Sequence, residues 1–112
     1  MSEKLNILWT NDNVELAHSM VFMYAINSKI NNWWDEVNII IWGPTARLVA
    51  TNEGVQEKIK MALHAGISIQ ACEACANQFG VAEDLRKLDI DVRFMGEPLT
   101  NILKTNEKLI TI

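Results

Sequence analysis

Proline and glycine are scarce in this sequence. The 112 residues include only 2 prolines and 5 glycines, whereas 49% are hydrophobic and 21% are charged. Disordered chains show the reverse pattern, because they lack the apolar surface that would offset the entropy lost on folding. A chain of this length suits one domain and buries roughly two-thirds of its unfolded surface. We therefore expect one globular domain over residues 1–112.

Positive charge and long apolar runs are also in short supply. The chain has 10 Lys+Arg against 14 Asp+Glu, a net charge of −4, and no dense basic cluster. This balance argues against a nucleic-acid partner. The longest apolar run, residues 37–42, is strand-sized and far below the ~20 residues of a membrane span. The start of the chain shows no signal-peptide pattern, so we expect a cytoplasmic protein without membrane contact.

Cysteine occurs only twice, as Cys72 and Cys75. In a reducing compartment such a pair is more often reactive than a structural bridge. The spacing of one helical turn is compatible with a reversible disulfide, a shared metal, or a nucleophile with a neighbour. Structural zinc takes about four ligands, and His18 and His64 fall on other predicted helices. The turn after the first strand has no phosphate-binding glycines. We expect neither a metal nor another cofactor.

The apolar periodicity alternates between strand-like and helix-like stretches. The predicted strands span residues 5–9, 37–42, 67–71, 90–95 and 109–112. The predicted helices span residues 14–31, 53–64, 72–79, 82–88 and 98–104, with Gly66 ending the second in a left-handed conformation. Strands that alternate with helices imply right-handed crossovers and a parallel sheet. The predicted fold is α/β, a three-layer α/β/α sandwich with a five-stranded parallel sheet.

The carboxyl ends of these strands mark the predicted site. Ligands of parallel sheets bind there, because the loops that connect strands to helices gather at that edge. Asp12 and Glu97 also suit the first turn of a helix. The candidate pocket residues at this edge are Trp9, Asn11, Asp12, Trp42, Gly43, Pro44, Glu73, Gly96, Glu97 and Pro98.

Cys72 is the candidate reactive residue, because it follows a strand directly and opens a helix. Its sulfur is predicted to lie near unpaired backbone N–H groups, which would lower the pKa of the thiol. Glu73 opposes this effect modestly by adding a negative neighbour. A thiolate at this position can attack or accept a sulfur atom. The alternative is a small, buried, unreactive side chain at the end of a strand.

The predicted helix 14–31 is apolar around most of its circumference, which requires more cover than one sheet face. Either a partner subunit or neighbouring helices of the same chain could supply that cover. One stripe consists of Ala17, Met20, Val21 and Tyr24, and other directions carry Leu16, Phe22, Met23, Ile26 and Ile30.

Four stretches together resemble the DsrE/DsrF-like sulfur-relay family, in particular its small stand-alone members. The likeness covers nearly the whole chain. The matching stretches are residues 9–13, 41–46, 71–76 with Gly80 and Val81, and 95–100.

This resemblance implies a five-stranded parallel sheet and assembly into trimers or hexamers. It also implies that Cys72, at the end of the third strand, carries a persulfide between donor and acceptor proteins. Cys75 has no counterpart in the relay subunits, and we expect it to resolve the persulfide as a disulfide. The predicted protein is a homo-oligomeric carrier more than a turnover enzyme, because no general base stands beside the thiol.

Two other functions stay open at this point. One is a small-molecule binding or regulatory module with a pocket at Trp9, Trp42 and Pro98 and purely structural cysteines. The other is a dithiol redox protein that uses Cys72 and Cys75.

Overall fold

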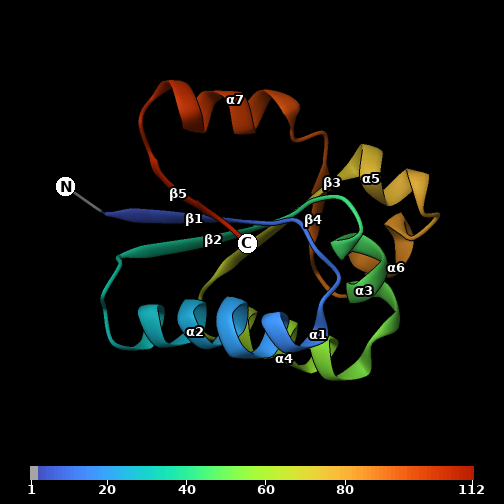
Figure 1. Ribbon diagram of the computed structural model, residues 1–112, viewed down its shortest axis with the longest axis horizontal. Helices are drawn as coiled ribbons and strands as arrows, with labels where there is room; N and C mark the ends of the chain where they lie inside the picture. Colours follow the sequence, from blue (N-terminus) through green and yellow to red (C-terminus); the bar gives the residue numbers. More distant parts are fainter. Residues whose placement is uncertain (1–2) are drawn as a thin grey trace.

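In the computed structural model, which describes residues 3–112, five parallel strands form one sheet with helices on both faces (Figure 1). The strand order is β4-β3-β2-β1-β5. The strands are β1 (Lys4–Trp9), β2 (Glu36–Ile41), β3 (Ser68–Cys72), β4 (Asp91–Arg93) and β5 (Lys108–Thr111). The predicted α/β fold with a five-stranded parallel sheet is confirmed.

Helices link successive strands. The first is continuous and consists of α1 (Val14–Leu16), the π-helical turn η1 (Ala17–Phe22) and α2 (Met23–Ile30). The others are α3 (Thr45–Thr51), α4 (Glu53–His64), α5 (Glu73–Gln78), α6 (Ala82–Arg86) and α7 (Gly96–Lys104). Asn13 caps α1 and Asn52 caps α4, each with a side-chain oxygen that accepts a backbone N–H. No helix in the described chain has both the length and the apolar character that crossing a membrane requires.

Helix α3 was not predicted from the periodicity. It has only seven residues, and the β-branched Thr45, Val49 and Thr51 weaken its helical pattern. Pro44 precedes its first turn with φ −65°, which is already a helical value. The helix begins there because of this preset backbone angle and its buried side.

Strand β4 is shorter than the predicted strand 90–95. Only Asp91–Arg93 pair, and they pair with β3 alone, because β4 lies at the edge of the sheet. Gly66 has φ +93°, so the left-handed conformation predicted for the end of α4 is present.

The two faces of the sheet have different cores. Figure 1 shows α1, α2 and α4 on one side and α7 alone on the other, with α3, α5 and α6 near the carboxyl ends of the strands. The larger core, under α2 and α4, takes alternate strand residues such as Ile7, Ile39 and Ile69. The smaller core, on the α7 face, takes Ile40 and Cys72. Because strand side chains alternate, each strand contributes to both cores.

A row of polar side chains crosses the α7 face at its amino-terminal half. Asn38 Nδ2 donates to Asn6 Oδ1 and to Gln70 Oε1, both at 3.1 Å. Asn6 Nδ2 donates to Glu107 Oε1 at 3.2 Å, and Ser68 Oγ donates to Asn38 Oδ1 at 2.9 Å. We call these five residues the polar row. Their mutual hydrogen bonds offset the cost of burying Asn6 and Asn38.

Candidate functional site

Cys72 lies at the junction that the sequence predicted. It is the last residue of β3 and the N-cap of α5, with an extended backbone. Its Sγ accepts a hydrogen bond from the backbone N–H of Cys75 at 3.4 Å. The sulfur therefore occupies the position that a serine or aspartate oxygen takes at many helix starts.

The side chain of Cys72 is only 4% exposed. It packs in the smaller core with Ile40, Met95 and Ile102, and Trp42 lies partly buried against the same cluster. Met95 immediately precedes α7, and Ile102 is the buried residue of that helix. At this exposure, little of Cys72 is open to a donor molecule.

The pKa of the Cys72 thiol is raised, so the predicted lowering is wrong. Burial is the largest cause, followed by a side-chain hydrogen bond with Cys75. The backbone N–H groups of Cys75 and Ala74 do lower the pKa, as expected, but their effect is smaller. Glu73 is not among the groups that shift it. Desolvation disfavours the thiolate more than two amides at a short helix favour it.

Cys75 lies beside Cys72 and is more accessible. It is half-buried, and both cysteines are free thiols. Cys75 packs against the small cluster that contains Cys72, and its backbone N–H is the donor to Cys72 Sγ. A nucleophile and a second thiol are therefore already adjacent, as the spacing predicted.

Glu73 turns its carboxylate toward α6. Its Oε1 lies 3.0 Å from Arg86 Nη2, and Arg86 Nη1 lies 2.7 Å from Glu83. Glu73 thus ties α5 to α6. Its charge is directed to the guanidinium.

Thr45 joins the loops that follow β1 and β2, and sequence reasoning missed it. Its buried Oγ1 donates to the carbonyl oxygens of Trp9 at 3.0 Å and Asn11 at 2.7 Å. Asn11 also holds its own loop, because its Oδ1 accepts the N–H of Asn13. The available signal was a threonine directly after a Gly-Pro turn, where a hydroxyl often bonds nearby backbone.

Asp12 takes part in a second tie across the strand ends. Its carboxylate lies 3.3 Å from Arg47 of α3. The Arg47 guanidinium also lies over the Phe79 ring, 5.1 Å from the centroid. Arg47 therefore connects the loop after β1 with the end of α5. The partner of Asp12 is this arginine.

Trp9 and Trp42 do not share a pocket. Trp9 is fully buried in the larger core, where its ring meets Phe22 edge-on at 5.3 Å. Trp42 lies on the opposite face with Cys72. The two residues meet only through the backbone, since the N–H of Trp42 donates to the Trp9 carbonyl at 3.0 Å.

The other predicted residues lie around the start of α3 and α7. Gly43 has φ +69° and leads into Pro44 before α3. Gly96 and Glu97 are exposed at the start of α7, and Pro98 is half-buried in its first turn. Two members of the predicted set lie next to the cysteines. Trp42 packs against the cluster that contains Cys72, and Glu73 follows Cys72 directly in the sequence.

Metal ligands do not gather at this site. Across residues 3–112, no three His, Cys, Asp or Glu side chains come together in an arrangement that could hold a metal ion. The reactive groups at the carboxyl ends of the strands are the two neighbouring thiols of Cys72 and Cys75.

A solved structure shares this fold and much of the sequence. The conserved protein of unknown function BT1422 from Bacteroides thetaiotaomicron is 48% identical, with a TM-score of 0.97. The alignment covers 98% of this chain and 95% of that one. The chain belongs to the family of that protein. No protein-family model and no curated protein matches it.

A more distant structure gives a coarser comparison. The ychN protein of E. coli aligns over 100% of both chains with a TM-score of 0.73 and 10% sequence identity. At this identity the likeness concerns the fold alone. The comparison therefore supports the α/β fold of this chain.

Proposed function

We propose that this protein carries sulfane sulfur as a persulfide on Cys72. The observation that supports it most is the position of Cys72 Sγ, which caps α5 and accepts the N–H of Cys75, whose side chain packs against the same cluster. The DsrE-like fold of ychN supports the proposal at the level of the fold. A persulfide anion at this position would keep the backbone donors that the thiol sulfur has now.

Loading is a thiol–persulfide exchange. The Cys72 thiolate attacks the outer sulfur of a donor persulfide, R–S–SH. A new S–S bond forms on Cys72, the donor S–S bond breaks, and its electron pair leaves with the donor as the thiolate RS⁻. The products are the Cys72 persulfide and RS⁻. The outer sulfur moves without any external oxidant or reductant.

Burial sets the conditions for this exchange. The raised pKa keeps Cys72 as a thiol at neutral pH, so little of it is nucleophilic in the closed protein. Contact with a donor that displaces Met95 would expose the sulfur and remove the largest cause of the raised pKa. After transfer, the same packing would shield the persulfide from other thiols. A donor protein and an acceptor protein are the partners this scheme requires.

Cys75 supplies a release step. Its thiolate attacks the inner sulfur of the Cys72 persulfide, a Cys72–Cys75 disulfide forms, and HS⁻ leaves with the electron pair of the broken bond. The packing of Cys75 against the cluster of Cys72 supports this role.

Intact mass measurement after incubation with a low-molecular-weight persulfide tests the carrier proposal. We expect the parent chain to gain one sulfur atom, and Cys72→Ser to gain none. Cys75→Ser should hold the added sulfur longer than the parent, because the release step is gone. Equal uptake by the parent and Cys72→Ser, or no uptake by either, would contradict the proposal.

A dithiol redox couple is the second candidate, and the placement of two free thiols in one small cluster favours it. It predicts a Cys72–Cys75 disulfide in equilibrium with a glutathione buffer. Thiol labelling across buffers of different potential would detect that disulfide. A protein that forms it readily but gains no sulfur from the persulfide would be a redox protein and no carrier.

A further inference from the structure

The outer side of the first helix carries an exposed apolar seam. Leu16, Met20, Met23 and Ile30 are between 37% and 62% exposed, and Asn27 is exposed between them. The spacing along the chain is 4, 3, 4 and 3 residues. Over the regular α-helix Met23–Ile30 this is the spacing of helix–helix seams, and a single asparagine within such a seam fixes its register. Neighbouring helices of the same chain were one of the two predicted covers for this helix. They leave these five residues exposed.

Most exposed apolar residues of the described chain lie on this side. Of its nine large exposed hydrophobic side chains, seven belong to the first helix, the loop after it and α4, while only Phe94 and Leu103 lie elsewhere. Trp33 extends the seam at 56% exposure, and Met61 of α4 flanks it at 50%. Such clustering marks an interaction surface, since scattered single residues are the norm on monomers.

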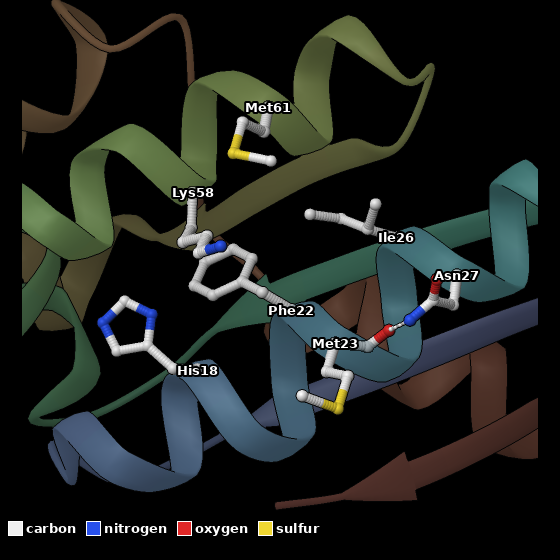
Figure 2. A pocket seen from close by; sticks show the side chains of 7 residues that line it. All are labelled: His18, Phe22, Met23, Ile26, Asn27, Lys58 and Met61. Atoms are coloured by element: carbon white, nitrogen blue, oxygen red, sulfur yellow. Dashed lines mark hydrogen bonds between the residues drawn. The ribbon is translucent and has the colours of Figure 1, made fainter.

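Two hollows along the seam share their central residues. One, of about 190 Å³, lies between the first helix and α4 and is lined by Lys58 and Met61 from α4. Figure 2 shows Lys58 reaching toward the Phe22 ring across the gap between the helices, while the Met23 side chain points away from α4. The second hollow, of about 290 Å³, extends toward Trp33. Met23 and Asn27 line both hollows, so they mark the centre of the surface.

The charge of this surface differs from that of the whole chain. The chain has 14 Asp+Glu and a net charge of −4. The residues that line the two hollows include no carboxylate, and their charged or titratable members are Lys58, His18 and Tyr24. Two copies that meet here would keep their acidic groups apart. A strongly basic partner would find no opposite charge at this surface.

From these features we infer that a second copy of this chain covers the seam, with a two-fold axis near Met23. Leu16 lies seven residues before Met23, and Ile30 lies seven residues after it. An antiparallel pairing about Met23 therefore sets Leu16 of one copy against Ile30 of the partner subunit. Such a contact is self-complementary, as a two-fold interface must be. It also aligns the helix dipoles favourably.

The available area fits this pairing. The six exposed side chains of the seam and its flanks provide apolar surface at roughly 100 Å² apiece, most of the roughly 800 Å² per partner of a standard interface. Lys58, His18 and Ser19 lie beside them as a polar rim. The pairing is independent of the sulfur chemistry proposed for Cys72.

Light scattering of the purified full chain after size exclusion tests the pairing. We expect Met23→Glu to halve the molar mass of the assembly, because it brings two carboxylates together at the axis. Met23→Lys should do the same. An equimolar mixture of the two variants should restore the parent mass, because opposite charges then face each other. Met23 is 57% exposed, so both variants should keep the circular dichroism spectrum of the parent.

Leu103→Glu is the matched control, since Leu103 is 59% exposed on α7, on the other side of the sheet. It should leave the mass unchanged. A monomeric parent, an unchanged mass for Met23→Glu, or halving by Leu103→Glu would overturn the inference. Dissociation by both Met23 variants without recovery in the mixture would overturn the two-fold axis at Met23.

Discussion

Ile39 and Ile40 are neighbours on β2, and both are fully buried, yet they belong to different cores. Ile39 lies in the larger core beneath α2 and α4, where the buried side chains are mostly apolar. Ile40 lies in the smaller core with Cys72 and Met95, beside the polar row. One face of the sheet thus provides most of the stability. The other face combines a small apolar cluster with the reactive Cys72. It is covered by α7 alone, whose one buried residue is Ile102.

The most severe test of this contrast is a matched pair of truncations on β2. We expect Ile39→Ala to cost about 4–5 kcal/mol of unfolding free energy, because the larger core cannot collapse around the cavity. Ile40→Ala should cost about 2–3 kcal/mol, because α7 can settle onto the smaller cluster. Urea unfolding followed by circular dichroism measures both. Equal losses would mean that the two cores are equally rigid.

Removing the centre of the polar row should have the next largest effect. Asn38→Ala leaves Asn6 Oδ1, Gln70 Oε1 and Ser68 Oγ without the partners that they have now. We expect a loss of about 1–3 kcal/mol in the same unfolding experiment. Asn77→Ala, an exposed change on α5, is the control and should stay within about 0.5 kcal/mol. An unchanged unfolding free energy for Asn38→Ala would show that water replaces the hydrogen bonds of Asn38 at no cost.

The raised pKa of Cys72 predicts a pH dependence of its reactivity. In Cys75→Ser, alkylation of the remaining cysteine should reach half its maximal rate at a higher pH in the folded chain than in denaturing urea. Mass spectrometry of quenched samples gives the two rates. A lower half-maximal pH in the folded chain would mean that the backbone N–H groups outweigh burial.

The same shift links stability to pH. The unfolded chain loses the Cys72 proton first as pH rises, because its thiol pKa is the ordinary value of about 8.5. The stability from the protonated thiol is therefore complete below that pH. It is lost progressively as pH rises through the raised pKa of the folded chain. Cys72→Ser should lack this loss of stability at high pH. Unfolding curves of the parent and the variant, recorded at neutral and alkaline pH, measure the difference.

The smallest effect should come from the exposed tie at the carboxyl ends of the strands. Arg47→Ala removes the ion pair with Asp12 and the contact with the Phe79 ring. Both partners of the ion pair are about half exposed, so we expect a loss of at most about 1 kcal/mol. Arg93→Ala, which breaks the exposed pair with Asp91, is the control. A loss above that of Asn38→Ala would make this tie a main support of the site.

Much of the site could be placed from local sequence. The strand before Cys72 and the helix after it are both visible in the pattern of apolar residues, so its position at their junction followed. The position of Cys75 one turn later followed from helix geometry. Trp9 and Trp42 were grouped because both end strands. Their side chains point to opposite faces, since Trp9 is in register with Ile41 and not with Trp42.

The sequence by itself determined the order of the strands and of every helix except α3, because apolar periodicity and capping residues are local properties of the chain. It also placed the sulfur at the start of α5. Only the tertiary structure decided how deeply that sulfur is buried and that its pKa is raised. The burial of Cys72 depends on Met95 and Ile102, which lie more than 20 positions further along the chain. They contact Cys72 only because α7 folds back over the sheet.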